Sequence, residues 1–326
     1  MEAQIKLSNE SQITFHDHKP LHFSLYDAVV NGFSKPRKSI PPKFFYDARG
    51  SRLFDEICDQ PEYYLPDIEK KLFITHMDEI SESIGKGRVI IEPGAGNLSK
   101  IRLLLDTLKP DSYIPMDISS DYLQWACNEL AKDYSWLSIH ATCVDFTHSL
   151  PLPGPISAAP RLAFFPGSSL GNFHKDEALQ FLSMIRETIG NDGMLLIGVD
   201  TKKSHNILNA AYNDAAGITA QFNLNLLHRI QSELDAEFKL KNFDHHAFYN
   251  KSESRIEMHL VSQCSHQVRI DEHDFHFDHG ETLHTECSYK YTPDEFLNLA
   301  SKAGLAEVKH WLAEDELFAI YLLKAI

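Results

Sequence analysis

The sequence of 326 residues predicts an α/β protein with a doubly wound parallel sheet and a second, smaller α+β part. The first indication is a β-branched run, residues 89–91, that leads into a turn with Gly94 and Gly96 and then into a helical pattern. The second is the alternation of strand-like and helical segments up to residue 199. The third is the change after Asp200, where helices are followed by alternating strands.

The first two-thirds of the chain supplies the parallel sheet. Gly94 and Gly96 allow a sharp turn after the first buried strand, and Pro110 ends the helix that follows. A short helix near residues 24–32 and an aromatic segment at 44–57, which packs a helix onto the sheet, precede this unit. The remaining predicted elements are a strand at 113–117, a helix at 119–131, strands at 136–141 and 162–165, a helix at 175–189 and a strand at 194–199.

The last third of the chain predicts the smaller part and then a return to the main sheet. Residues 204–231 have a helical pattern, and residues 238–268 and 281–289 are β-rich. Ile256, Met258 and Leu260 alternate with polar residues and predict the inner face of a strand. A helix at 293–303 and strands at 306–311 and 317–323 predict an antiparallel hairpin at the edge of the main sheet.

Composition excludes several classes of protein. The formal net charge of -15 argues against a nucleic-acid partner and against an anionic membrane surface. No apolar run approaches the span of a bilayer, and residues 1–20 lack the apolar core of a signal peptide, which predicts a cytoplasmic protein. The five cysteines are scattered and never spaced Cys-x-x-Cys, so we expect reduced thiols rather than disulfides or a cysteine zinc site.

The glycine turn predicts a cofactor that contains adenosine. Asp117 ends the next strand, 21 residues after Gly96, where an acidic residue can accept the hydroxyls of a ribose. Ser99 stands where a dinucleotide fingerprint has a smaller residue, and Glu92 suits a cofactor with an ammonium and a sulfonium. These residues favour S-adenosylmethionine over NAD, with an NAD oxidoreductase as the alternative.

A histidine-rich run is the main feature that this interpretation leaves aside. His273, His276 and His279 follow at intervals of three residues, close to the pair His245 and His246. A metal-binding module is therefore a second alternative, but the spacing matches no standard zinc site and the acidic run also fits a solvated loop.

Several longer motifs together resemble a known family. They are Phe45-Tyr-Asp47, Gly50-Ser-x-Leu-Phe-Asp55, Pro61-Glu-Tyr-Tyr64, Gly167-Ser-x-x-Gly-Asn172, Ala211-Tyr-Asn-Asp-Ala-Ala-Gly-Ile-Thr219, Arg255-Ile-Glu-Met258 and Thr285-Glu-x-Ser288. From about residue 40 onward the chain resembles the histidine Nα-methyltransferases of ergothioneine biosynthesis. The resemblance implies three methylations of the α-amine of L-histidine, giving hercynine.

The resemblance also implies an architecture. It predicts a class I methyltransferase core, with a Rossmann-like doubly wound sheet, from residues 64–200 and 289–326. Residues 1–63 and 201–288 would form a separate α+β substrate-binding domain. Pro66-Asp67 departs from the Thr-Arg usual in the family, so a methyltransferase of a modified histidine or of another aromatic amino acid stays open.

The resemblance finally assigns binding roles to individual residues. The residues implied for S-adenosylmethionine are Tyr46, Gly94, Lys100, Asp117, Asp145 and Phe146. Those implied for histidine are Tyr63, Asn172 and Tyr212 at the carboxylate, and Met258, Glu286 and Ser288 at the imidazole. Direct displacement by a neutral amine needs no obligate base, so we expect no catalytic side chain, no metal, no cation at the carboxylate and a monomer that binds small molecules.

Overall fold

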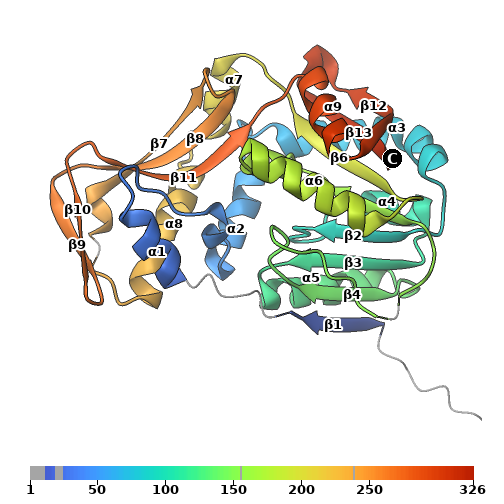
Figure 1. Cartoon of the computed structure of the whole chain (residues 1–326), viewed down its shortest axis with the longest axis horizontal. Helices are drawn as coiled ribbons and strands as arrows, with labels where there is room; N and C mark the ends of the chain where they lie inside the picture. Colours follow the sequence, from blue (N-terminus) through green and yellow to red (C-terminus); the bar gives the residue numbers. More distant parts are fainter. Residues whose placement is uncertain (1–11, 19–24, 155, 238) are drawn as a thin grey trace, which may run out of the picture.

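A computed structural model describes residues 12–18, 25–154, 156–237 and 239–326 of the chain (Figure 1). The polar residues 1–11 and the first residue of the helix predicted near 24–32 lie outside these ranges. Figure 1 shows a large sheet with its helices beside a smaller group of strands and helices, to which β7, β8 and β11 belong. None of the described helices is long and apolar enough to cross a membrane.

The large sheet has eight strands in the order β1-β4-β3-β2-β5-β6-β13-β12. The first six strands of this order are parallel, and β13 and β12 form an antiparallel hairpin at one edge, which confirms the predicted fold class. The strands are β1 (Ile13–Asp17), β2 (Val89–Pro93), β3 (Ser112–Asp117), β4 (Ile139–Cys143), β5 (Arg161–Phe165), β6 (Met194–Asp200), β12 (Leu305–Leu312) and β13 (Phe318–Ala325).

Helices cover both faces of this sheet, and β2 is therefore buried on both sides. Ile90 packs in a cluster with α3 (Leu65–Ile84), α4 (Arg102–Leu108) and α5 (Ser120–Asp133). Val89 and Ile91 point the opposite way, toward α6 (Lys175–Ile189) and α9 (Pro293–Lys302). A strand with apolar residues on both faces therefore lies between two layers of helices, as its sequence predicts.

Some element boundaries differ from the prediction for local reasons. Helix α4 begins at Arg102 rather than at Leu98, because Leu98 has a φ of 56° and cannot belong to a right-handed helix. Strand β4 begins at Ile139, three residues later than predicted. Helix α3 was not among the predicted elements, although Pro66 in its first turn and Gly85 after its end are boundary signals.

The β-rich residues of the smaller part form a three-stranded sheet, in the order β11-β8-β7, and a two-stranded sheet of β9 and β10. Ile256, Met258 and Leu260 of β8 are buried, as their alternation predicts, and they pack against α1, α2 and α8. The elements are α1 (Leu25–Phe33), η1 (Pro42–Phe45), α2 (Ala48–Cys58), α7 (His205–Ala211), α8 (Ile218–Glu233), η3 (Leu240–Asn242), β7 (Phe243–Asn250), β8 (Arg255–Ser262), β9 (His266–Ile270), β10 (His273–Phe277) and β11 (Thr282–Tyr289). The aromatic segment at 44–57 thus packs on α8 rather than on the large sheet.

The two parts meet where the chain leaves the large sheet and returns to it. The exit at Thr201, after β6, and the return at Tyr291, after β11, are joined by a parallel bridge. Helix η2 (Ser169–Asn172), which follows β5, packs on β11, and η4 (Glu314–Glu316) precedes β13. The division into two domains stays a prediction, but β1 was expected in the substrate domain and is instead an edge strand of the large sheet.

Candidate functional site

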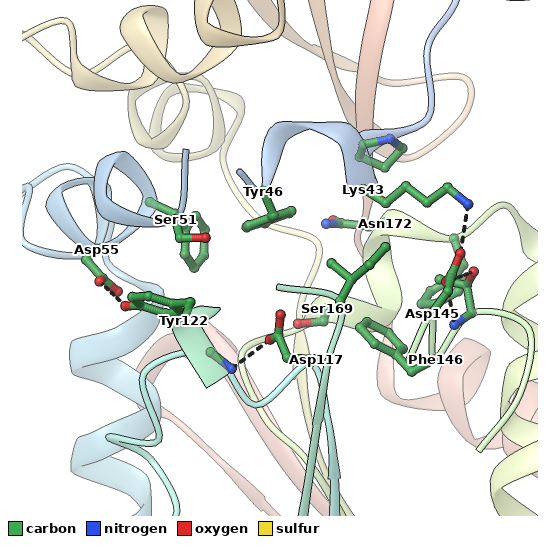
Figure 2. A pocket seen from close by; sticks show the side chains of 17 residues that line it. Lys43, Tyr46, Ser51, Asp55, Asp117, Tyr122, Asp145, Phe146, Ser169 and Asn172 are labelled. Carbon is green, nitrogen blue, oxygen red and sulfur yellow. Dashed lines mark hydrogen bonds and ion pairs between the residues drawn. The ribbon is translucent and has the colours of Figure 1, made fainter. Parts of the chain in front are cut away.

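A cavity of about 1020 Å³, part of it open to solvent, lies at the carboxyl ends of the parallel strands. Its floor comes from the segments after β2, β3, β4 and β5, and its opposite wall comes from η1 and α2 (Figure 2). Ligands of doubly wound sheets bind at this edge. The cavity brings together six of the predicted residues, namely Tyr46, Gly94, Asp117, Asp145, Phe146 and Asn172.

Gly94 shapes the cavity because no other residue fits its position well. Its φ is 67°, and a Cβ atom built there would lie 3.2 Å from two ring carbons of Phe146. Glu92, expected to face the ligand, is instead buried beneath the turn and accepts a hydrogen bond from Tyr113. Burial raises the pKa of Glu92 to about 8 despite that bond.

Asp117 presents its carboxylate at the end of β3. Gly96 N donates to Oδ2 and Ser119 N donates to Oδ1, each at 3.0 Å. Burial raises the pKa of Asp117, while the backbone donors oppose that rise. Each oxygen retains a lone pair, so the carboxylate can accept two further hydrogen bonds from neighbouring hydroxyls. The two hydroxyls of a ribose could supply these two hydrogen bonds.

Asp145 and Phe146 follow β4, on the side of the cavity away from Asp55 and Tyr122 (Figure 2). Lys43 of η1 forms an ion pair with Asp145, with 2.7 Å between Nζ and Oδ2. Burial acts to raise the pKa of Asp145, but Lys43 and the Thr147 hydroxyl outweigh it and lower that pKa. The aromatic face of Phe146 and the anionic Asp145 suit an adenine ring and its amino group.

Lys100 is not among the residues that line this cavity. Its ammonium pairs with the buried Glu69, with 2.7 Å between Nζ and Oε2. The other oxygen of Glu69 accepts a hydrogen bond of 2.7 Å from Gly167 N. Through Glu69, Lys100 supports the segment after β5, and its contact with the cofactor stays a prediction.

The remaining predicted residues gather in a buried region next to the cavity. Asn172 joins the two, because its backbone oxygen accepts a hydrogen bond of 3.7 Å from the Cys287 thiol of β11. The rings of Tyr63 and Tyr212 meet edge to face at 6.0 Å between centroids. Glu286 pairs with Met258 across β11 and β8, so these two side chains share one face of the small sheet.

Glu286 has the least satisfied charge of this region. Its side chain is buried, and among the residues that the structure describes none donates a hydrogen bond or forms an ion pair with its carboxylate. Burial raises the pKa of Glu286 to about 7, and Lys290 opposes that rise. A buried carboxylate without a donor is energetically costly, so this group is prepared for a ligand that supplies an N–H.

Comparison with known proteins decides the family. A family model described as histidine-specific methyltransferase, SAM-dependent, matches residues 25–325. The chain belongs to this family. It is 35% identical over 308 residues to the histidine N-alpha-methyltransferase of Mycobacterium tuberculosis, covering 92% of this chain and 95% of that protein. It is 37% identical over 290 residues to the enzyme of the same name from Mycolicibacterium smegmatis, covering 87% and 89%.

A fungal relative extends the comparison. The chain is 30% identical over 308 residues to ergothioneine biosynthesis protein 1 of Neurospora crassa, covering 88% of this chain and 33% of that longer protein. Membership of the family confirms that the protein is a methyltransferase enzyme that uses S-adenosylmethionine and acts on a small molecule, and it excludes the NAD oxidoreductase. The cavity fits that cofactor, because Asp117, Asp145 and Phe146 offer partners for a ribose and an adenine.

The methyltransferase site contains a buried ionic group that the sequence analysis missed. Lys290, directly after β11, forms an ion pair with Asp200 at the end of β6, with 2.7 Å between Nζ and Oδ2. Asp200 also pairs with Lys203 and accepts a 2.8 Å hydrogen bond from the Tyr64 hydroxyl. Burial acts to raise the pKa of Asp200, but the two lysines outweigh it. No sequence signal marks Lys290, because lysines are usually exposed.

The histidine-rich run is not among the groups of described side chains whose ligand atoms lie close enough together to hold one metal ion. His273 and His276 lie on β10, whose Phe275 and Phe277 are buried, so the run is a packed strand rather than a solvated loop. A different group, Glu257, His259 and His284, offers ligand atoms within 4.8 Å of one another. Arg255 already pairs with that glutamate at 2.6 Å, and its charge would repel a cation.

Proposed function

We propose that this protein methylates the α-amino group of L-histidine three times and so forms hercynine, a step of ergothioneine biosynthesis. The observation that carries the proposal is Glu286, a buried carboxylate that receives no hydrogen bond from the described residues and lies two positions before Ser288 on the same strand. A neutral imidazole has one N–H donor and one nitrogen acceptor. Glu286 can accept from the first and Ser288 can donate to the second.

The other end of histidine would meet hydroxyl and amide groups. Tyr63, Asn172 and Tyr212 can donate to its carboxylate. Burial raises the pKa of both tyrosines, so their hydroxyls stay protonated at neutral pH and remain donors. Holding both ends of the substrate orients the α-amine toward the cavity, where S-adenosylmethionine supplies an electrophilic methyl group when bound.

Methyl transfer to a neutral amine requires no covalent intermediate on the protein. The α-amino group titrates near pH 8 in peptides, so the first transfer uses the neutral fraction of the amine, and the ammonium formed by each of the first two transfers must lose its proton to water before the next one. The main contribution of the protein is then to position the amine and the methyl group. The rings of Tyr46, Phe54 and Phe222 contact each other and would exclude water from the reacting atoms.

A modified histidine or another aromatic amino acid is the second candidate substrate. Met258 supports it, because a methionine beside Glu286 can adapt to rings of different size. Both candidates use the same pocket and the same reaction, so one assay separates them.

The test is mass spectrometry after incubation with S-adenosylmethionine and a panel of amino acids. The proposal expects histidine to gain one, two and three methyl groups, with a higher specificity constant than any other amino acid in the panel. Preferential methylation of tryptophan, phenylalanine or a ring-modified histidine would favour the second candidate. Transfer to DNA, protein or lipid instead of amino acids would overturn both.

We also propose that the enzyme works in the cytoplasm as a monomer that does not bind nucleic acid. The five cysteines are all free thiols in the structure, which supports the cytoplasmic location. The net charge of -15 supports the lack of nucleic-acid binding. Light scattering of the purified protein tests the monomer, and a gel-shift assay with DNA and RNA tests the lack of binding.

A further inference from the structure

Lys290 is the most deeply buried cation next to the proposed histidine pocket. Its side chain is 0% exposed, and its ammonium reaches three oxygens. Nζ lies 2.7 Å from Asp200 Oδ2, 3.0 Å from Ser288 Oγ and 3.3 Å from Tyr212 Oη. Asp200 alone would compensate the charge, so the contacts with both hydroxyls need a separate explanation.

The hydrogen-bonding capacity of an ammonium supplies that explanation. It has three N–H donors and no acceptor, so the three contacts of Lys290 use it completely. Tyr212 and Ser288 must therefore both accept from Lys290, and each must send its own hydrogen elsewhere. Without a substrate the Ser288 hydroxyl can donate to the Tyr212 oxygen, and a ring nitrogen of a bound substrate would then compete for that hydrogen. In either arrangement the Tyr212 hydrogen points away from this ionic group.

We propose that Lys290 is a positioning residue that makes Tyr212 and Ser288 hydrogen-bond donors to the substrate. Donors at these two positions select ligand groups that accept: a carboxylate at Tyr212 and an unprotonated ring nitrogen at Ser288. The inference rests on the proposed histidine function and deepens it. It also qualifies our expectation that no cation acts at the substrate carboxylate. In this proposal a cation does act there, but only through the hydroxyl group of Tyr212, and Asp200 compensates its charge.

Lys290 also influences the charge of Glu286. The titratable groups that face Glu286 are Tyr46 after η1, Tyr63 before α3, Tyr212 after α7, and Cys287 and Lys290 from its own segment. Among them Lys290 is the cation that lowers the pKa of Glu286, against the larger effect of burial. Loss of Lys290 should therefore keep Glu286 protonated to higher pH and weaken its acceptance of the imidazole N–H.

Lys203 provides a matched control for a variant of Lys290. Both lysines are buried and pair with Asp200. The other partners of Lys203 are the Tyr64 hydroxyl and the Thr201 carbonyl, each at 2.8 Å. K203M therefore removes a buried ammonium and an ion pair as K290M does, but it leaves the contacts with Tyr212 and Ser288 intact.

The experiment compares wild type, K290M and K203M in histidine methylation between pH 6 and 9, with thermal unfolding and cofactor affinity measured for each. For K290M we expect KM for histidine to rise roughly tenfold or more, kcat to change less, and cofactor affinity to stay within about threefold. The acidic limb of kcat/KM should move to higher pH in K290M and stay in place in K203M. A double-mutant cycle with Y212F should show that K290M costs less once the Tyr212 hydroxyl is gone, with the remaining effect acting through Ser288 and Glu286.

Equal effects of K290M and K203M on KM and on the pH profile would overturn the positioning role while leaving the histidine function intact. A wild-type protein that methylates no histidine would overturn both. If K290M does not fold, K290M/D200N, which removes the Lys290–Asp200 ion pair and keeps Lys203, is compared with D200N, which keeps both lysines, on the same measurements.

Discussion

Replacement of Glu286 by alanine tests the substrate assignment most directly. Burial raises the pKa of this carboxyl from 4.5 to about 7, which corresponds to about 3 kcal/mol of unfavourable free energy for the anion. An imidazole N–H can recover much of that cost, whereas a benzene ring cannot. We therefore expect the E286A change to reduce the preference for histidine over phenylalanine by about 1 to 3 kcal/mol, or roughly 5- to 150-fold.

The assay is the ratio of kcat/KM for histidine and for phenylalanine, measured by mass spectrometry in wild type and in E286A. E253A serves as the control, because Glu253 is an exposed carboxylate before β8 and its loss should leave the ratio unchanged. Cofactor affinity should be equal in all three proteins. A ratio in E286A within about twofold of the wild-type value would show that Glu286 does not recognise the side chain, and the reasoning from its burial would be wrong.

Three further predictions follow from the same geometry. D117A should weaken S-adenosylmethionine binding by about 1.5 to 3 kcal/mol in calorimetry, because both ribose acceptors are lost; unchanged affinity would remove Asp117 from the site. N172A should lower histidine affinity and leave cofactor affinity nearly intact, since its side chain lines the far end of the cavity; equal loss of both would indicate a structural role. E286Q should raise the free energy of unfolding at pH 8 but not at pH 4, because the raised pKa of Glu286 in the folded state lowers stability as pH rises from 4.5 to about 7; an equal change at both pH values would contradict the pKa shift.

Much of the fold could be predicted because its signals are local. The helix at Lys175–Ile189 was predicted with its exact boundaries, and the alternation in β8 identified its buried face. The start of α4 could not be predicted, since only the backbone shows that Leu98 adopts a positive φ. The place of β1 depends on pairing with β4, more than a hundred residues away, and no local pattern encodes that choice.

The site divides in the same way. Asp117 and Gly94 could be located from strand-turn-helix chemistry, and they line the cavity. Lys100 and Lys290 show the limit of such reasoning, because a lysine in a sequence does not reveal its partner. Lys100 forms an ion pair with Glu69, and Lys290 is buried in contact with Asp200 and two hydroxyl groups. Both outcomes depend on carboxylates distant in sequence.

The bridge between Thr201 and Tyr291 bears on how acceptor preference can diverge in this family. Because the intervening stretch starts and ends at adjacent points, its sequence can change without altering the register of the eight-stranded sheet. The pocket, however, also uses Tyr46 and Tyr63, which lie between β1 and β2 in the chain and so outside that stretch. If only the residues between Thr201 and Tyr291 were exchanged, the imidazole contacts of one enzyme would be combined with the Tyr46 and Tyr63 positions of another. Transplanting selectivity between relatives therefore requires two separate segments to be exchanged together.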